Sequence, residues 1–409
     1  MSGQSTLGDV LVDIQAGRSF QTTEALARID ELGVLKVSAV SWSAFKPDEA
    51  KAVVGYEPEA HHRVRRGDLL MSRANTKELV GAVVLVEKDY PLRLLSDKTL
   101  RLVVAPEKVD KSYLLFALRS DSARKHIEHF ATGSSESMRN IAQSVITSIP
   151  LILPSSAEQR RIVARLSNQL TAVEEARHAA QAQLSEIRLL KAQALKAAFA
   201  AIEDSCPLGK VARIQSGYAF KSGTFQKLGV RLLRNANISP GRVYWDDTVS
   251  LSPDAATAHT AYALADGDVL ISLDRPIISS GIKVARVTAT DLPALLVQRV
   301  GRFRIDETRL NADYLYAFLH TEPFIEAISG HEQSLGVPHI SPGQIEAIKI
   351  PLPSLKEQQR LAVILNQIAE ATREAEVAAE QQLKDIELLP SRLLAEVFGA
   401  ASLTEDNGD

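Results

Sequence analysis

The sequence predicts an α+β protein with a pseudo-two-fold internal repeat, in which two similar mixed α/β domains are separated by two long antiparallel, coiled-coil-like helices. A repeat of about 200 residues and two long amphipathic helical stretches lead to this prediction. The chain has 409 residues, of which 45% are hydrophobic and 24% charged, so it is long enough to form two or more folded domains.

The repeat consists of short motifs that recur in the same order at separations of 199 to 201 residues. The opening motif, LGDV followed by IQAG at residues 7–17, returns as LGKV and IQSG at 208–217. RGDLLMS at 66–72 returns as DGDVLIS at 266–272, and a later LPS-EQ-R motif also occurs twice. Because each copy is large enough to hold its own core, the period indicates duplicated domains and not a solenoid of short repeats.

Each globular part mixes short β-like runs with helical patterns, and glycine, proline and aspartate interrupt it often. Strand-like runs are expected at 79–86, 100–104, 268–273 and 281–287, and helices at 113–130 and 312–328. The pattern favours a mixed α/β module with many loops.

Each globular part is followed by a stretch in which apolar residues recur every three or four positions, as on one face of a helix. The first stretch contains neither glycine nor proline from Ala157 to Ile202. Ser155 and Ser354 each precede a glutamate by three residues, which fits a capping box, so each helix should begin close to its serine. Pro390 should kink the second helix or end its regular part.

A helix of about 40 residues is roughly 60 Å long, and its continuous apolar face needs a partner. The second helix can be that partner, because alanines in the middle of both faces let two axes approach closely. The side chains expected to pack the pair are Ile162, Leu166, Leu170, Leu184, Ile187, Leu361, Leu365, Ile368, Leu383 and Ile386. The alternative is two separate helices, each packed on its own domain.

The chain is expected to divide into a first globular domain (1–150), a central long spacer helix (151–206), a second globular domain (207–350), a C-terminal long spacer helix (351–399) and a flexible acidic tail (400–409). Lys and Arg number 20 against 19 Asp and Glu in the first domain, and 15 against 14 in the second. The net charge of −3 therefore arises from the last segment, and a local basic face on either domain is permitted.

Bulk features favour a cytoplasmic protein. The single cysteine, Cys206, excludes an internal disulfide framework, and no apolar run approaches the roughly 20 residues that span a bilayer. The sequence also begins without the basic and apolar stretches of a signal peptide.

Taken together, the doubled motifs resemble the specificity subunit of a type I restriction-modification system, over essentially residues 7–399. No single motif is specific, whereas their combination, found twice in the same order, is. The resemblance implies a non-catalytic subunit in which each globular part is a target recognition domain that reads one half of a bipartite sequence in double-stranded DNA. It further implies that the helices fix the spacer and dock two methylation subunits, which bind S-adenosylmethionine, while restriction and motor subunits join the full complex.

Polar loops at matching places in the two domains are the candidate DNA contacts, because arginine and lysine can pair with guanine, and asparagine with adenine. The candidates are Arg18, Gln21, Arg73, Asn75, Thr76, Lys77, Ser134, Arg139 and Asn140 in the first domain, and Tyr218, Lys221, Arg234, Asn235, Asn237, Asp274, Arg275, Gln333 and Ser334 in the second. Contact with phosphate or solvent alone is the alternative for Arg73 and Arg275, and Phe20 and Phe220 are expected in the core.

The sequence favours neither catalysis nor a metal site of its own. It lacks the Asp-Pro-Pro-Tyr and Asn-Pro-Pro-Tyr motifs of amino-methyltransferases and the Gly-Lys-Ser/Thr phosphate loop. A nuclease motif is only superficially suggested at 47–51, and His61-His62 has no cysteine or clustered carboxylate at a ligand spacing. Two alternatives stay open: a non-catalytic protein-interaction scaffold with duplicated domains, and a stand-alone methyltransferase.

Overall fold

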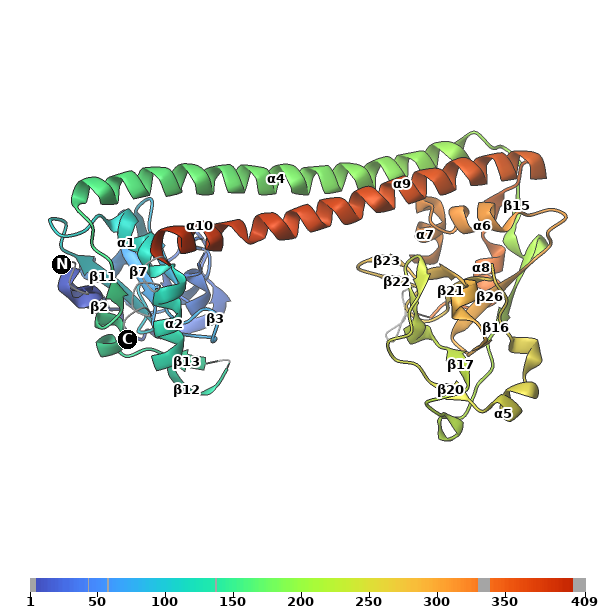
Figure 1. Ribbon diagram of the computed structural model, residues 1–409, viewed down its shortest axis with the longest axis horizontal. Helices are drawn as coiled ribbons and strands as arrows, with labels where there is room; N and C mark the ends of the chain where they lie inside the picture. The colour runs from blue at the N-terminus through green and yellow to red at the C-terminus, as the bar shows by residue number, and fades with distance from the viewer. Residues whose placement is uncertain (1–4, 43, 57–58, 137, 330–338, 400–409) are drawn as a thin grey trace, which may run out of the picture. The chain divides into compact units, whose positions relative to one another are not determined.

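The computed structural model describes residues 5–42, 44–56, 59–136, 138–329 and 339–399. The chain forms two compact units, one of Met1–Ala180 with Gln382–Asp409 and the other of Gln181–Gln381. In each unit a globular α/β part carries segments of two long helices (Figure 1). None of the helices in the described ranges is both long and apolar enough to cross a membrane.

The first unit contains the N-terminal globular part, the start of the first long helix and the end of the second helical stretch. Its strands are β1 (Ser5–Thr6), β2 (Leu11–Ala16), β3 (Thr22–Leu26), β4 (Gly33–Leu35), β5 (Ala50–Val53), β6 (Arg63–Val64), β7 (Leu69–Ser72), β8 (Ala74–Asn75), β9 (Val83–Leu85), β10 (Tyr90–Leu94), β11 (Thr99–Val104), β12 (Thr132–Ser135), β13 (Met138–Asn140) and β14 (Pro150–Leu151). Its helices are α1 (Lys111–Leu118), α2 (Asp121–Phe130), α3 (Gln143–Thr147), the start of α4 (Ser156–Ala200) and α10 (Leu389–Phe398).

The second unit repeats this plan. Its strands are β15 (Ser205–Pro207), β16 (Ala212–Ser216), β17 (Val230–Leu233), β18 (Ile238–Ser239), β19 (Arg242–Val243), β20 (Ser250–Leu251), β21 (Val269–Ser272), β22 (Ile277–Ile278), β23 (Gly281–Ile282), β24 (Val284–Arg286), β25 (Ala294–Leu296), β26 (Val300–Ile305) and β27 (Lys349–Pro351). Its helices are the end of α4, α5 (Pro253–Thr257), α6 (Ala312–Phe318), α7 (Glu322–Ser329), α8 (Pro342–Ala347) and most of α9 (Leu355–Glu387).

Both units are built on the same four-stranded antiparallel sheet. The strand order is β2-β11-β7-β9 in the first unit and β16-β26-β21-β24 in the second. Every residue of β7 and β21, the strands of the two Gly-Asp motifs, is buried. A parallel strand pair also recurs, as β4 with β10 and as β17 with β25. The predicted fold class, mixed α/β domains carrying long antiparallel helices, is confirmed.

The glycines of the opening motif are required by close backbone packing. A Cβ added at Gly17 would lie 2.1 Å from the carbonyl oxygen of Leu95, and one at Gly217 would lie 2.2 Å from that of Val297. Backbone bridges join the following residues, Arg18 and Tyr218, to the same segments. The motif therefore marks a place where one chain segment lies directly on another.

The predicted helices at 113–130 and 312–328 are each two helices, which corrects that expectation. In the first unit Ser120 ends α1 and caps α2, because its hydroxyl accepts a hydrogen bond from Ala123 N at 3.4 Å. In the second, Pro323 lies in the first turn of α7, where its missing N–H is tolerated. The expected strand at 79–86 is only β9, since Gly81 adopts a φ of 79° in a preceding turn.

The long helices begin where the serines predict. α4 starts after Ser155 and α9 after Ser354, and each hydroxyl accepts a hydrogen bond from the backbone N–H three residues later at 3.4 Å. α9 ends at Glu387, and α10 follows with Pro390 in its first turn, so the proline interrupts the helix as expected.

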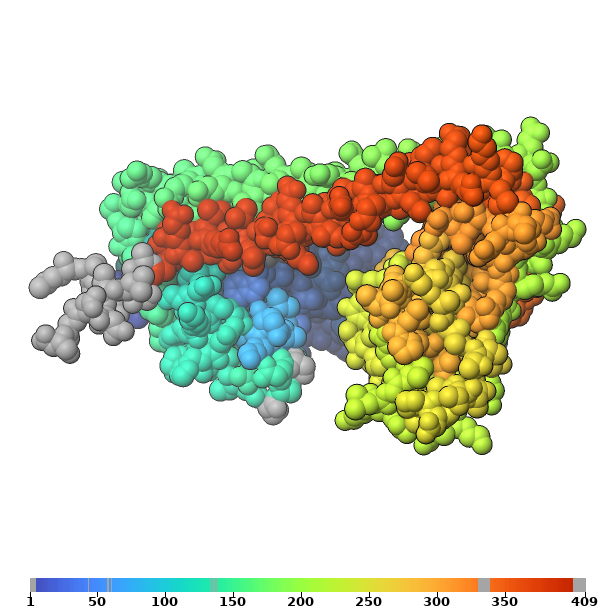
Figure 2. Space-filling model, turned by 45° about the vertical axis from the view of Figure 1, so that its right-hand side comes forward, coloured from blue at the N-terminus to red at the C-terminus, as the bar shows by residue number. Residues whose placement is uncertain are grey.

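Segments of the two helical stretches pack antiparallel within each unit. In the first unit the start of α4 contacts α10, because Leu166 shares a cluster with Leu394 and Phe398. In the second unit the end of α4 contacts the start of α9, because Phe199 clusters with Ala362 and Leu365. Figure 2 shows α9, in red, lying over the orange atoms of α6 and α7 in the second unit.

The ten predicted packing residues are all buried or partly buried. Leu166, Leu184, Leu365 and Ile386 are buried, and the remaining six are half-buried. Leu190, placed at the end of the first apolar face by its spacing, is instead 62% exposed. The buried face continues instead through Ala194 and Leu195, which are partly buried, to the buried Phe199.

Candidate nucleic-acid interface

In the first unit, the candidate loop after β7 and the candidate loop near residue 134 form one small sheet. β12, β13 and β8 pair in that order, and Arg139 lies opposite Asn75. Ser134 belongs to β12, and Asn140 at the end of β13 is exposed. Two loops that are 60 residues apart in the sequence therefore present one surface.

The side chains of this small sheet divide into outward and inward groups. Arg73 is exposed, and no ion-pair partner for it is found among the described residues. Lys77 is exposed beside Glu136, at 3.6 Å, and Thr76 is half-buried. Asn75 is only 5% exposed, and its amide donates to Val37 O at 3.1 Å and to the hydroxyl of Ser72. Asn75 thus stabilises the loop from within, whereas the exposed Arg73 presents its charge to solvent.

In the second unit, Asn235 organises the loop after β21. Its amide donates to the carbonyl oxygen of Asp274 at 3.2 Å, and its Oδ1 accepts a hydrogen bond from Ser272. The ammonium of Lys283 donates to Asn235 at both O, 2.7 Å, and Oδ1, 3.0 Å. Burial lowers the pKa of Lys283. Two candidates distant in sequence, Asn235 and Asp274, are thereby brought together.

The next residue, Arg275, is exposed and has a φ of 46°, which non-glycine residues rarely adopt. Asp274 before it is held by His339 at 2.7 Å and by Arg299 at 3.5 Å, and Arg299 itself has a φ of 72°. Arg275 is thus presented to solvent by a loop in which side-chain hydrogen bonds fix its neighbour. Gln333 and Ser334 lie outside the described residues.

Two further candidates of the second unit are engaged internally. Asn237 is 1% exposed, and its amide donates to Tyr244 O and Asp247 O at 2.9 and 3.1 Å. Arg234 forms an ion pair of 2.9 Å with Asp247 and is only partly exposed. Both residues tie the segment before β18 to the segment after β19 and leave little polar surface for a ligand.

The opening motifs end in aromatic clusters at equivalent places. In the first unit the Arg18 guanidinium lies 5.5 Å from the ring centre of Phe20 and 5.3 Å from that of Tyr56. In the second, Tyr218 lies 4.9 Å from Phe220 and 4.4 Å from the ring of His259. Both phenylalanines are half-buried. Arg18 and Tyr218 are exposed, as are the other two candidates here, Gln21 and Lys221.

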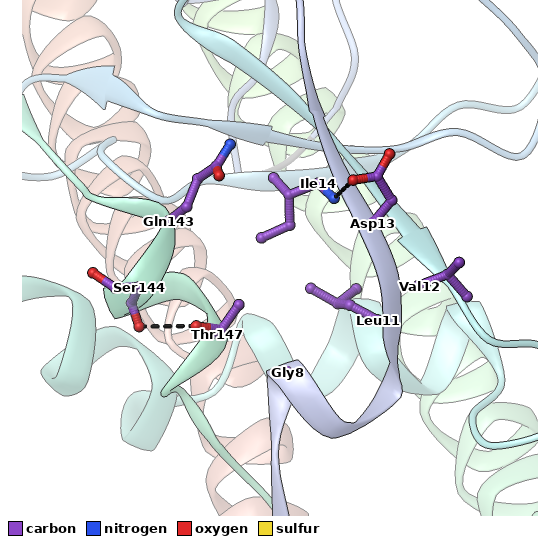
Figure 3. Close-up of a pocket in the computed structure, with 8 residues that line it drawn as sticks. All are labelled: Gly8, Leu11, Val12, Asp13, Ile14, Gln143, Ser144 and Thr147. Carbon is purple, nitrogen blue, oxygen red and sulfur yellow. Dashed lines mark hydrogen bonds between the residues drawn. The ribbon is translucent and has the colours of Figure 1, made fainter.

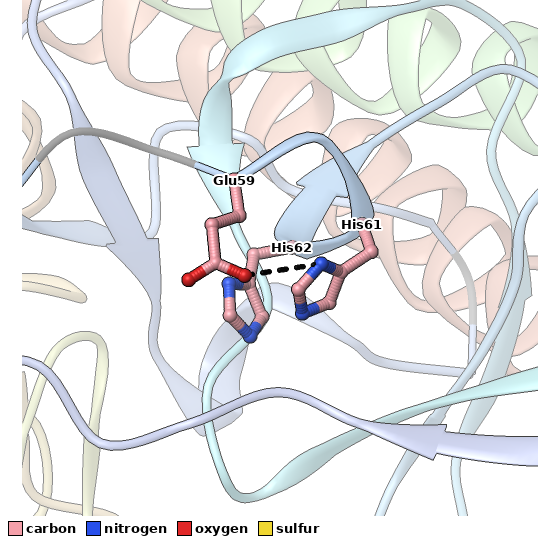
Figure 4. A group of neighbouring side chains, drawn as sticks. All are labelled: Glu59, His61 and His62. Carbon is pink, nitrogen blue, oxygen red and sulfur yellow. Dashed lines mark ion pairs between the residues drawn. The ribbon is translucent and has the colours of Figure 1, made fainter.

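A possible metal-ligand set borders the first cluster. The donor atoms of Glu59, His61 and His62 lie within 4.8 Å of one another (Figure 4). Nδ1 of His62 is already bonded to the Tyr56 hydroxyl at 3.0 Å, and burial lowers the pKa of that imidazole. With three donors from four consecutive residues and the cation Arg18 nearby, the group is better explained as part of the aromatic cluster than as a metal centre.

A shallow pocket in the first unit lies between the opening motif and α3. It is lined by Leu11, Val12 and Ile14 on one side and by Ser144 and Thr147 on the other (Figure 3). Gly8, Asp13 and Gln143 complete the lining, and the Asp13 carboxylate accepts a hydrogen bond from the backbone N–H of Ile14. These residues include neither a nucleophile paired with a base nor a cradle for phosphate.

The chain thus consists of two similar α/β modules, each of which packs on segments of the long helices and presents a loop with an exposed arginine. Residues 204–385 match the family model for the type I restriction modification DNA specificity domain. The chain is 42% identical over 156 residues to the EcoAI specificity subunit of Escherichia coli, covering 38% of this chain and 26% of that protein. It is 27% identical to the MjaVIII specificity subunit of Methanocaldococcus jannaschii, covering 67% of each.

Solved structures show the same fold. A chain from a study of complex assembly and conformational transition in the type I R-M system has a TM-score of 0.75, with 19% identity and 97% of both chains covered. The HsdS subunit of Thermoanaerobacter tengcongensis gives 0.58, with 20% identity and coverage of 97% and 96%. The resemblance to type I restriction-modification specificity subunits is thus confirmed, although the chain spans only about a quarter of the length of the EcoAI subunit.

Sequence reasoning missed several residues that hold the globular parts to the helices. Gln159 and Gln358, within the repeated EQ motif, are almost completely buried, as are Phe199 and Phe398 near the ends of the helical stretches. The signal was present, because each pair recurs at a separation of 199 residues. The spacing of apolar residues along a helix does not show that these positions are buried, because they contact elements far away in the sequence.

Proposed function

We propose that this chain is the non-catalytic, sequence-specific DNA-binding subunit of a type I restriction-modification complex. Each globular part would read one half of a bipartite target in double-stranded DNA. The observation that carries the proposal is that both units place an exposed arginine, Arg73 or Arg275, in the loop that follows the same strand of the same sheet. A shared scaffold with different loop residues suits two different half-sites.

The division of the candidates into exposed and internal groups makes the proposal more specific. Arg73 with Asn140 in the first unit, and Arg275 in the second, are proposed to contact bases or phosphate. Arg18, Gln21, Tyr218 and Lys221 would flank them. Lys77, Ser134 and Arg139 are proposed to contact the phosphate backbone of DNA, because such contacts need only a positive charge or a hydrogen-bond donor.

The long helices are proposed to fix the spacer between half-sites and to dock two methylation subunits. S-adenosylmethionine would be bound by those subunits and not by this chain, and restriction and motor subunits would complete the assembly. Exposed apolar residues on the helices, such as Val363 at 58% and Val377 at 57%, support a protein partner there.

A gel-shift experiment tests the proposal. The chain is mixed with its methylation subunits and a pool of duplexes carrying random sequence, and bound DNA is recovered and sequenced. Enrichment of a two-part motif is expected, and it should weaken as salt rises because lysine and arginine contacts release counterions. Absence of any shift at low salt would instead favour the interaction scaffold, and S-adenosylmethionine binding by the chain alone would favour a methyltransferase.

A further inference from the structure

The first turn of each long helix is tied to its globular part by one buried glutamine. In the first unit Oε1 of Gln159 accepts a hydrogen bond from Asp110 N at 2.8 Å. Its Nε2 donates to Pro154 O at 3.0 Å and to Lys108 O at 3.5 Å. Asp110 is the N-cap of α1, so the amide group links the starts of α4 and α1.

Gln358 makes the same three contacts in the second unit. Its Oε1 accepts from Asn311 N at 2.9 Å, and its Nε2 donates to Arg309 O at 2.9 Å and to Pro353 O at 2.8 Å. Asn311 is the N-cap of α6, so the starts of α9 and α6 are linked in the same way. Both glutamine side chains are at least 98% buried.

A tyrosine and a phenylalanine complete the attachment of each globular part to the helices. We call this attachment the joint; it consists of Gln159, Tyr113 and Phe398 in the first unit and of Gln358, Tyr314 and Phe199 in the second. The Tyr113 hydroxyl donates to Ile152 O at 2.7 Å, and its ring lies 5.6 Å from that of Phe398 in α10. The Tyr314 hydroxyl donates to Pro351 O at 2.9 Å, and its ring lies 5.0 Å from that of Phe199 in α4. Each globular part is therefore held by the start of one long helical stretch and by the end of the other.

We infer that Gln159 and Gln358 are positioning residues that fix the orientation of each recognition domain on its helices, and thereby set which half-site spacing the protein accepts. The inference rests on the proposed function. A buried amide with three backbone partners has one favourable orientation, because any rotation leaves a donor or acceptor without a partner. The identical joint in both units indicates that orientation, and not only attachment, is preserved.

The geometry of DNA explains why orientation matters. One base pair added to a spacer moves a half-site by about 3.4 Å and rotates it by roughly 35° about the helix axis. With a stiff joint the globular domain has one orientation and can bind a half-site at one such position. With a loose joint the domain has several orientations and can bind half-sites at several positions. Loosening lowers the effective concentration of the second domain at the correct spacer and raises its relative occupancy at wrong ones.

The experiment uses the full chain with its methylation subunits. Affinity is measured on three duplexes that carry the selected half-sites with the preferred spacer, one base pair less and one base pair more. The variants are Gln358→Met, which keeps the side-chain length and removes the three hydrogen bonds, and Gln367→Met on the exposed side of α9 as the matched control. Gln159→Met tests the first unit.

For Gln358→Met we expect preference for the correct spacer over the other two to fall by about 10-fold or more, with base preferences in both half-sites unchanged. Gln367→Met should keep the wild-type preference. An unchanged spacer preference in Gln358→Met, or an equal loss on all three duplexes, would overturn the inference, because equal loss marks a purely structural residue. A wild-type chain without sequence preference would overturn the proposed function itself.

If Gln358→Met does not fold, as judged by circular dichroism, Tyr314→Phe takes its place. That change removes only the hydroxyl donated to Pro351 O and keeps the ring beside Phe199. A smaller loss of spacer preference, about 3-fold, is then expected, because one hydrogen bond is removed and the three made by Gln358 remain. An unchanged preference in Tyr314→Phe would count against the inference.

Discussion

Arg302 Nη1 lies 2.9 Å from Asp268 Oδ2, and the arginine side chain is only 1% exposed. The same ion pair occurs in the first unit, where Arg101 Nη2 lies 2.7 Å from Asp68 Oδ2. Each aspartate comes from the repeated Gly-Asp motif and each arginine from the neighbouring strand, β26 or β11. The motif that identifies the repeat is therefore held by a buried ion pair and is not itself a reading element.

Removing the carboxylate should destabilise one unit strongly. Asp268→Ala leaves the guanidinium of Arg302 buried without its counter-charge, which costs about 3–5 kcal/mol for a buried pair. Hydrogen bonds from Arg302 to Ala263 O and to Gln215 favour the lower end of this range. Hydrogen exchange of the β21 and β26 amides measures the loss. Asp266→Ala, an exposed neighbour, is the control and should change stability by less than about 0.5 kcal/mol.

Leu166 should contribute to the stability of the first unit through the packing of α4 against α10. Leu166→Ala opens a cavity beside Leu394 and Phe398 and should cost about 2–5 kcal/mol. Leu190→Ala, on the same helix but 62% exposed, should change stability by less than about 0.5 kcal/mol. Thermal denaturation of both variants checks the pair, and equal effects would mean that the helix face is assigned incorrectly.

Arg73→Ala should affect one half-site only. Loss of a base contact would cost about 1–3 kcal/mol of binding free energy and relax recognition at one position of that half-site. The exposed Arg28, paired with Asp30 at 3.4 Å, provides a charge-matched control in the same unit. Affinities for duplexes with the selected motif and with single base changes in it distinguish a base contact from a phosphate contact. An equal loss of affinity on every sequence would indicate a phosphate contact.

Acid should destabilise the second unit through Asp291. Burial raises the pKa of this carboxyl, but hydrogen bonds from Trp245 and Thr288 outweigh burial, and the folded-state pKa is lowered below 3.8. Its contribution to stability is therefore complete above about pH 5 and is lost as the pH falls past the unfolded-state pKa and through the lowered folded-state pKa. Asp291→Asn should flatten this dependence while lowering stability at pH 7.

Fluorescence of Trp245 measures this acid transition directly, because its indole N–H donates to Asp291 at 2.8 Å. The second tryptophan, Trp42, is replaced by phenylalanine in both proteins so that a single indole reports. Identical transitions in the presence and absence of the carboxylate would show that other groups control acid unfolding.

The sequence predicted the features that depend on neighbouring residues. The serine caps at Ser155 and Ser354, the apolar helix faces and the break at Pro390 all follow from local spacing, and the structure places them as expected. The repeat itself was visible because the glycines and aspartates of the motifs have few tolerated substitutes at positive φ or in close backbone contact.

What depends on distant contacts was not predictable from one sequence. Asn75 and Asn237 look like surface amides in a polar segment. Yet Asn75 donates to Val37 O, 38 residues away, and Asn237 donates to Tyr244 O beyond β19, and both side chains are buried. Gln159 and Gln358 belong to a helix start that reads as polar and exposed, although they are buried against α1 and α6.

Methylation profiling tests whether the two globular parts read the two halves of one DNA target. Host DNA is sequenced with methylation detection after expressing the methylation subunits with the wild-type chain, with Arg73→Ala or with Arg275→Ala. We expect a methylated motif of two unlike halves with a fixed gap, in which each substitution relaxes a different half. One uninterrupted motif, or the same half altered by both substitutions, would contradict it.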